Sequence, residues 1–180
     1  FARRPERLEV AHPNLTHRAG DALDADDVAA AVKGHDAVII TLGAGASRSN
    51  LIRSQGTMNV IQAMHAHGVR RLVCQSTLGA HESWSNLNFF WKRIMFGWLL
   101  RPVFKDHELQ ESLVRASGLD WTIVRPSAFT DDEATGNYRV DFPPEDRDLT
   151  LKIPRADVAH FLNWQLCDDT FLMRAVGVSH

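Results

Sequence analysis

Residues 37–75, AVIITLGAGASRSNLIRSQGTMNVIQAMHAHGVRRLVCQ, decide the fold of this chain. They open with Ala37 to Leu42, a continuous and largely β-branched run that is typical of a strand buried on both faces. A helix is predicted from about Leu51 to His67, and Gly68 ends it. Arg71 to Gln75 is predicted to be the next buried strand. A strand, a helix and a second strand in this order indicate a parallel β-α-β unit with a right-handed crossover.

The same alternation extends in both directions along the chain. Upstream, a helix is predicted to begin at Asp24, whose side chain suits a helix N-cap, and to stop at Gly34. The other predicted segments are strands at Leu15–Ala19, Trp121–Arg125, Asn137–Val140, Leu149–Ile153 and Ala175–Val178, and helices at Asp106–Ser117 and Arg155–Leu166. This alternation predicts one Rossmann-type, doubly wound α/β domain over residues 1–180, with a parallel sheet covered on both faces.

Bulk composition is that of an ordinary globular domain. Of the 180 residues, 44% are hydrophobic and 23% are charged, and the formal net charge is −2. The chain therefore has no overall attraction to nucleic acid or to anionic membranes. The most apolar stretch, Phe89 to Leu100, is too short to span a bilayer. Cys74 and Cys167 lie in apolar stretches, so we expect buried, reduced thiols in a cytoplasmic protein with no nucleic-acid or membrane partner.

Four loops at the ends of predicted strands are expected to form one ligand site. They are Gly20-Asp21, Gly43 to Ala46, Ser76-Thr77 and Pro126-Ser127. In open parallel sheets, ligands bind beyond the carboxyl ends of the strands, near the point where the strand order reverses. We therefore expect these loops to converge on a single ligand.

An ordered series of motifs makes the chain resemble a known superfamily. The series is GDALD (20–24), HDAVIITLGA (35–44), GTMNVIQAMHAHGVRRLV (56–73), QST (75–77), DHELQESLVRASGLDWTIVRPS (106–127) and IPRADVAHFL (153–162). In order and spacing it resembles the atypical short-chain dehydrogenase/reductase superfamily. The nearest likeness is the NAD(P)H-binding group that contains the biliverdin/flavin reductases and the NmrA-like proteins. The resemblance implies that residues 1–180 form a single NAD(P)-binding domain.

Members of that group normally open with a strand and a G-x-x-G-x-x-G turn, whose backbone amides bind the cofactor pyrophosphate. Here the segment from Phe1 to Arg4 resembles the end of the second strand. We therefore expect that the sequence lacks the first strand-helix unit, roughly 30 residues of a β-α-β motif.

The resemblance places Arg3, Arg4 and Arg7 after the second strand, where members contact the adenosine ribose. An acid there holds the 2′-hydroxyl of NAD, whereas arginine suits the 2′-phosphate of NADP. We therefore expect NADP(H) to be preferred over NAD(H).

Two further turns match the adenosine side of the family site. Asp21 and Ala22 match a Gly-Asp turn beside the adenine, where the carboxylate either accepts the adenine amino group or caps the turn. Leu42, Gly43 and Ala44 are expected to let the backbone approach the cofactor, because small residues permit close contact.

The nicotinamide side is expected at two other strand ends. Ser76 and Thr77 match the position of the catalytic serine, and Ser76 is our best catalytic candidate because a hydroxyl there can orient the carboxamide or donate to a carbonyl oxygen. The resemblance also places Pro126, Ser127 and Ala128 along the nicotinamide. The residue before them, Arg125, is expected either to approach the phosphates or to close an ion pair in the core.

The chain departs from the family at its usual Tyr-x-x-x-Lys pair. Alignment on Glu111 puts Val103 at the tyrosine position and His107 at the lysine position. The sole tyrosine, Tyr138, lies elsewhere, so ordinary alcohol/ketone chemistry is disfavoured. His107 is a candidate proton donor, although a histidine at the start of a helix also has an ordinary structural role. No metal site is expected.

These patterns predict an NADPH-dependent oxidoreductase that reduces a flavin, a quinone or a similar small planar acceptor. The aromatic segment from Phe89 to Trp98 has three open interpretations: a roof over such an acceptor, an interface of a homodimer, or packing on the sheet. Two other functions stay open. One is a non-enzymatic NADP(H)-sensing protein of the NmrA-like kind, and the other is a nucleotide-sugar epimerase or dehydratase.

Overall fold

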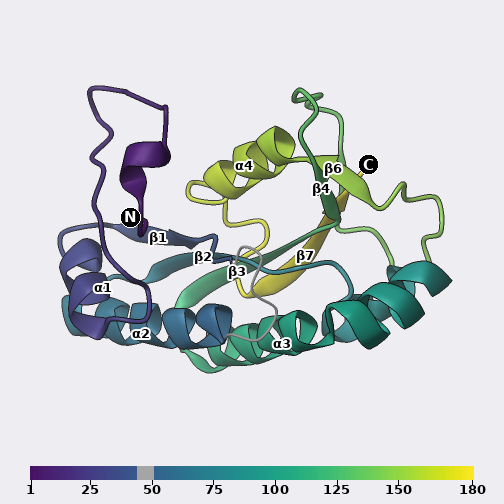
Figure 1. Cartoon of the computed structure of the whole chain (residues 1–180), viewed down its shortest axis with the longest axis horizontal. Helices are drawn as coiled ribbons and strands as arrows, with labels where there is room; N and C mark the ends of the chain where they lie inside the picture. Colours follow the sequence, from purple (N-terminus) through teal and green to yellow (C-terminus); the bar gives the residue numbers. More distant parts are fainter. Residues whose placement is uncertain (44–50) are drawn as a thin grey trace.

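The computed structural model describes residues 1–43 and 51–180. Its elements appear in Figure 1. In chain order they are η1 (Pro5–Arg7), α1 (Ala25–Val32), β1 (Ala37–Ile40), α2 (Ile52–His67), β2 (Arg71–Gln75), η2 (His81–Asn86), η3 (Phe90–Leu99), α3 (Arg101–Ala116), β3 (Asp120–Pro126), β4 (Ala128–Thr130), β5 (Arg139–Val140), β6 (Lys152–Pro154), α4 (Arg155–Trp164) and β7 (Arg174–Ser179).

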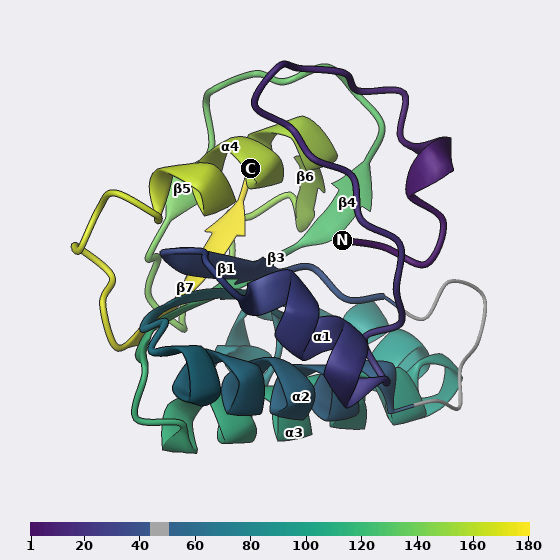
Figure 2. The ribbon, with the colours of Figure 1, turned by 90° about the vertical axis from the view of Figure 1, so that its left-hand side faces the viewer.

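The elements form a three-layer α/β domain, as predicted. The main sheet has the order β1-β2-β3-β7-β5, with β1, β2, β3 and β7 parallel and β5 antiparallel to β7. Strands β4 and β6 form a separate parallel pair. Helices α1, α2 and α3 cover one face of the main sheet and α4 covers the other (Figures 1 and 2). The expected Rossmann-type fold is thereby confirmed.

The continuous apolar strands of the sequence are explained by these two helical layers. Successive side chains of a strand point to opposite faces. On β2, Leu72 belongs to the core beneath α1, α2 and α3, whereas Val73 belongs to the core beneath α4. On β3, Ile123 and Val124 divide in the same way, and all four side chains are fully buried. Both faces of the central strands must therefore be apolar.

Four predicted strands differ from the structure, two of them only in their bounds: Asn137–Val140 is a strand at Arg139–Val140, and Leu149–Ile153 is a strand at Lys152–Pro154. Leu15–Ala19 is not a strand: only Ala19 pairs, in an isolated parallel bridge with Ala2, because residues 11–19 are exposed and have no apolar face to bury. Ala37–Leu42 is a strand only as far as Ile40, and Ile40 alone is fully buried there. The reason is its position, since β1 lies at an edge of the main sheet.

Two further predictions need correction. The helix expected from Asp106 begins earlier, at Arg101, because Pro102 is tolerated in a first helical turn. Cys74 is buried as expected, but Cys167 is exposed, since it lies in the turn after α4. Within the described ranges, no helix combines the length and the apolar character that crossing a membrane requires.

Candidate functional site

Two cavities border the parallel strands, and they meet at the carboxyl end of β1. The first, of about 460 Å³, runs beside β1, and the second, of about 490 Å³, lies over the ends of β2 and β3. Thr41, Leu42 and Gly43 line both cavities. Each volume is in the range of small-molecule sites. The segment after β1 thus joins the two cavities.

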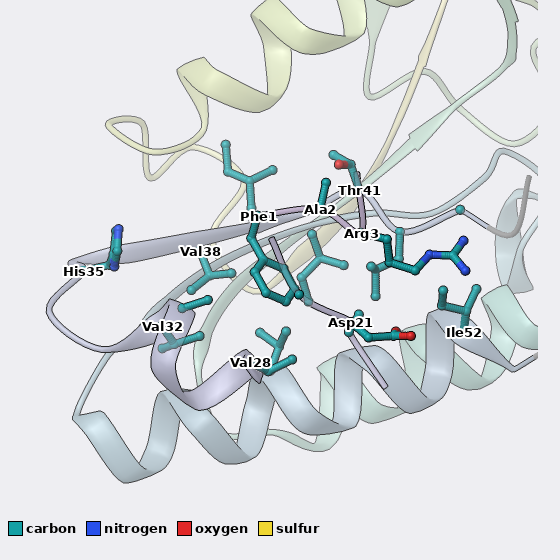
Figure 3. A pocket seen from close by; sticks show the side chains of 18 of the residues that line it. Phe1, Ala2, Arg3, Asp21, Val28, Val32, His35, Val38, Thr41 and Ile52 are labelled. Carbon is teal, nitrogen blue, oxygen red and sulfur yellow. The ribbon is translucent and has the colours of Figure 1, made fainter. Parts of the chain in front are cut away.

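The first cavity, here called the trench, is bounded by the N-terminal segment, α1 and β1. Its floor is apolar and includes Phe1, Val28 and Val32 (Figure 3). Arg3 and Asp21 lie together toward the end that leads to Ile52 (Figure 3). Arg3 and Asp21 therefore lie at the end that meets the second cavity, whereas His35 lies at the opposite end (Figure 3).

The trench also borders the edge of β1 that faces away from β2. In the described part of the chain, β1 pairs only with β2. Ala2, which also lines the trench, pairs with Ala19 and not with β1. An open strand edge beside an apolar channel suits pairing with a further extended segment. The floor of the trench is apolar and suits such a segment. The candidates for nucleotide binding are therefore the polar residues at its rim, Arg3 and Asp21.

Local contacts hold the rim of the trench in place. The Asp21 carboxylate accepts a hydrogen bond from the Leu23 amide at 3.0 Å, so it caps its own turn. The Asn59 side chain donates to the carbonyl oxygen of Ala22 at 2.9 Å, which ties this turn to α2. Beneath both lies Gly56, where an added Cβ would come within 2.6 Å of Leu42 and 3.2 Å of Ala22. A glycine here lets α2 approach the two turns closely.

The second cavity, here called the central cavity, brings together the predicted nicotinamide-side residues. Ser76 and Thr77 enter it from the end of β2, while His107 and Val103 come from α3. The end of β3 supplies Pro126, the start of β4 supplies Ala128, and Ser127 lies between them. These strand ends converge as predicted.

The aromatic segment from Phe89 to Trp98 has some side chains at the central cavity and others exposed to solvent. It is wound as a π-helix, η3, and its Trp91 and Phe96 line the central cavity. Phe96 also stacks on Phe104 of α3, with ring centroids 4.7 Å apart. Phe89 and Trp98, in contrast, are exposed. One side of the segment therefore roofs the cavity.

Three of the predicted residues at the central cavity carry a buried polar atom without a hydrogen-bond partner in the described structure. These atoms are Ser76 Oγ, Ser127 Oγ and His107 Nδ1, and their residues are only 2%, 7% and 8% exposed. A buried polar group that lacks a partner costs about 1–3 kcal/mol. Such groups in one cavity are suited to a ligand that supplies the missing hydrogen bonds.

Burial and the charge of Arg53 lower the pKa of His107 to about 3. The imidazole is therefore neutral near pH 7 and does not act as a cationic acid there. A neutral ring still offers one N–H donor and one acceptor. This favours a hydrogen-bonding role for His107 over proton donation.

Arg125 lines neither cavity. Its Nε and Nη2 donate to Glu111 at 2.9 and 2.6 Å, and its Nη1 lies 2.9 Å from Glu82. Both Arg125 and Glu111 are buried. The sequence left two roles open for Arg125, a contact with the phosphates or an ion pair in the core. The structure shows the ion pair in the core.

Two other predicted residues are not brought into the cavities. Arg4 and Arg7 are exposed and do not line the trench, which leaves Arg3 as the arginine of that group at the rim. Ala44 lies outside the described residues. No cluster of three or more potential metal-ligating side chains occurs in the ranges 1–43 and 51–180.

Arg53 is a cavity residue that the sequence patterns did not single out. It lies in the first turn of α2 and lines the central cavity. A cation in the first turn of a helix is unfavourable, because it opposes the helix dipole. This unfavourable position was the signal in the sequence that could have identified Arg53. The structure explains in part how an arginine is tolerated in this turn, because Asp106 of α3 places a carboxylate there and accepts hydrogen bonds from the amides of Arg53 and Ser54 at 3.0 and 3.1 Å.

The fold and the paired strand-end cavities define a Rossmann-type dinucleotide-binding protein. The chain belongs to the NAD(P)H-binding family, whose model matches residues 1–169. This confirms the resemblance from which the site residues were predicted.

Individual relatives agree in fold and differ in their names. A Bacillus subtilis protein named "uncharacterized sugar epimerase YhfK" is 31% identical over 117 residues, which cover 62% of this chain and 49% of that protein. The chain thus spans about half the length of the curated relatives it matches. A short-chain dehydrogenase/reductase of Veillonella parvula, solved with NADP, has a TM-score of 0.79 at 18% identity and covers 99% of this chain and 80% of its own. ChuY of Escherichia coli O157:H7, described as an anaerobilin reductase, has a TM-score of 0.70 at 26% identity, over 89% and 72% of the two chains.

Proposed function

We propose that this protein is an NADPH-dependent oxidoreductase that reduces a planar acceptor such as a flavin, a quinone or a tetrapyrrole. One observation carries the proposal: Ser76, Ser127 and His107 carry buried polar atoms without a partner in the described structure and line a cavity that is roofed by Trp91 and Phe96. Aromatic walls suit a flat, conjugated ligand. ChuY, described as an anaerobilin reductase, supports an acceptor of this kind.

The residues present fit the adenosine half and the nicotinamide half of a dinucleotide. Arg3, Asp21 and Ala22 would hold the adenosine half at the rim of the trench, and the backbone of Leu42 and Gly43 would lie at the junction. When bound, NADPH supplies a hydride with two electrons, and the acceptor takes its balancing proton from solvent. Ser76 and Ser127 would orient the carboxamide and the acceptor by hydrogen bonds, while the aromatic roof excludes water.

The missing Tyr-x-x-x-Lys pair separates this proposal from epimerase chemistry. Val103 lines the central cavity at the tyrosine position, whereas the Tyr138 hydroxyl lies 2.9 Å from His160 and outside both cavities. Hydride transfer to a conjugated acceptor does not require a phenol that protonates an alkoxide. We therefore do not propose for this protein the sugar-epimerase activity that appears in the name of the Bacillus subtilis relative.

The proposal is tested by NADPH oxidation with a panel of flavins, quinones and bilins. We expect turnover with at least one acceptor, and we expect Ser76→Ala to lower its kcat about tenfold, the effect of one lost hydrogen bond. Ser83→Ala is the matched control, because Ser83 is also buried but its hydroxyl bonds Ala80 and Gly79 within its own loop. NADPH binding without oxidation by any acceptor would contradict the proposal and would favour a sensor of NADP(H).

Cofactor preference gives a second prediction. Arg3→Met is expected to weaken NADPH binding about tenfold and to leave NADH binding unchanged, because a charge-assisted bond to the 2′-phosphate is lost. Arg7→Met is the control, since Arg7 lies outside the trench. The two dissociation constants can be measured by the fluorescence of the reduced cofactors. Equal losses for NADPH and NADH would show that Arg3 does not read the 2′-phosphate.

A further inference from the structure

The charged side chains among the described residues that line the central cavity are cationic. They are Arg53 and Arg155, and no aspartate or glutamate occurs among the described residues that line the cavity. His107 is held neutral by burial and by the charge of Arg53. An apolar cavity with cationic groups and no acids favours a ligand that carries a negative charge.

The two arginines differ in their surroundings. The Arg155 side chain is 58% exposed and pairs with Asp131 at the surface. The Arg53 side chain is only 12% exposed, and its Nε and Nη1 have no hydrogen-bond partner in the described structure. Burial, which outweighs the nearby charge of Asp106, lowers the pKa of the Arg53 guanidinium. Arg53 is therefore the cation with unused donors.

Asp106 does not use those donors. Its carboxylate lies 3.9 Å from Arg53 Nη1, too far for a hydrogen bond. It already accepts three hydrogen bonds from the first turn of α2: from the Arg53 amide, from the Ser54 amide and from Ser54 Oγ at 2.6 Å. The carboxylate holds the helix end, and Arg53 lines the same cavity as Ser76, Ser127 and His107, which also carry polar atoms without partners in the described structure.

We infer that the central cavity selects planar acceptors that carry an anionic group, a carboxylate or a phosphate, and that Arg53 binds this group. A guanidinium offers a planar fork of donors that matches the oxygens of either anion. The aromatic roof would hold the conjugated ring while Arg53 fixes its charged substituent. This inference rests on the proposed function for its substrate, but the binding site itself can be tested without turnover.

Matched ligand pairs isolate the anionic group. FMN and riboflavin share one ring system and differ by a phosphate, and biliverdin and its dimethyl ester differ by two carboxylates. Flavin binding is followed by quenching of flavin fluorescence, and bilin binding by absorbance. We expect the wild-type protein to bind the anionic member of at least one pair about 10–100-fold more tightly, as for a charge-assisted hydrogen bond.

Three variants then test Arg53 itself. Arg53→Met should abolish the preference within the pair while leaving the neutral member unaffected, and Arg53→Lys should restore part of it. Arg155→Met is the matched control in the same cavity and should have a much smaller effect. In assays with turnover, the loss should appear in the KM for the acceptor and not in the kcat.

Several results would overturn the inference. Equal binding within both pairs would show that the cavity does not select an anion. An equal effect of Arg155→Met would indicate general electrostatic attraction instead of a held group. A weaker affinity for NADPH in Arg53→Met, with the preference within the pair unchanged, would assign Arg53 to the cofactor. Anion-selective binding without NADPH oxidation would support this inference and contradict the proposed reductase activity.

Discussion

Replacing Arg125 with methionine is expected to lower the free energy of unfolding by about 3–5 kcal/mol, the effect of breaking a buried ion pair. The side chains of Arg125 and Glu111 are 2% and 0% exposed, and their closest contact is 2.6 Å. The substitution leaves the Glu111 carboxylate buried, with Nε2 of His81 and Nη2 of Arg115 as the nearest remaining basic nitrogens at 3.9 and 3.8 Å. Urea unfolding at neutral pH measures the loss.

Two companion variants make the result specific. Arg115→Met removes an arginine that contacts the same two acids but is 38% exposed, so it should cost less than about 1 kcal/mol. Arg125→Met combined with Glu111→Leu removes both buried charges and should recover most of the stability, because an apolar pair of similar volume needs no desolvation. Equal losses in the two arginine variants, or no recovery in the double variant, would contradict this account.

Glu82 adds a dependence on pH. Partial burial would raise the pKa of Glu82, but the hydrogen bond and the charge of Arg125 lower it from 4.5 to about 2. Because the pKa in the folded state is the lower one, the ionised carboxylate stabilises the fold above its unfolded pKa. This contribution is lost as the pH falls through about 2. Arg125→Met should therefore weaken the fall in stability at acidic pH, whereas parallel pH profiles of the two proteins would argue against the contact.

Asp106→Ala is expected to lower the free energy of unfolding by about 2–4 kcal/mol. The change removes the cap of α2, which is worth about 1–2 kcal/mol, and leaves the buried Ser54 hydroxyl without its 2.6 Å partner. It also frees the end of α2 that carries Arg53 and approaches both cavities. Urea unfolding measures the stability, and binding of the anionic flavin FMN reports on the site.

A second N-cap in the chain provides the control for Asp106. Asp24 caps α1 by accepting hydrogen bonds from the amides of Asp26 and Asp27 at 2.9 and 3.0 Å. It is exposed and local in sequence, so Asp24→Ala should cost about 1 kcal/mol and should not affect flavin binding. If the two variants were equally stable, Asp106 would act as an ordinary surface cap and its role at the site would be refuted.

The site was partly predictable because strand ends in a parallel sheet meet at one edge. Ser76 and Ser127 were found in this way, since each directly follows a strand whose apolar run is visible in the sequence. Arg53 was not, because a first-turn arginine has no meaning until its surroundings are known. Arg125 illustrates the intermediate case: its position after a strand allowed both a phosphate contact and a core pair, and only the location of Glu111 on α3 distinguished them.

The sequence by itself determined the layers of the fold. The apolar runs of β2 and β3 and the helices around them require a sheet buried on both faces, because side chains alternate along a strand and each face must be covered. It also determined the local cap at Asp24, where the donors and the acceptor lie within three residues.

Tertiary structure alone decided the contacts between segments far apart in the chain. Asp106 was expected to begin its own helix, but it caps α2, whose amides lie 52 and 53 residues away. The exposure of Cys167 depends in the same way on which segments pack nearby. The physical reason is that periodicity and capping patterns record a residue's neighbours along the chain, whereas the burial and pairing of a charge depend on elements that approach only when the chain folds.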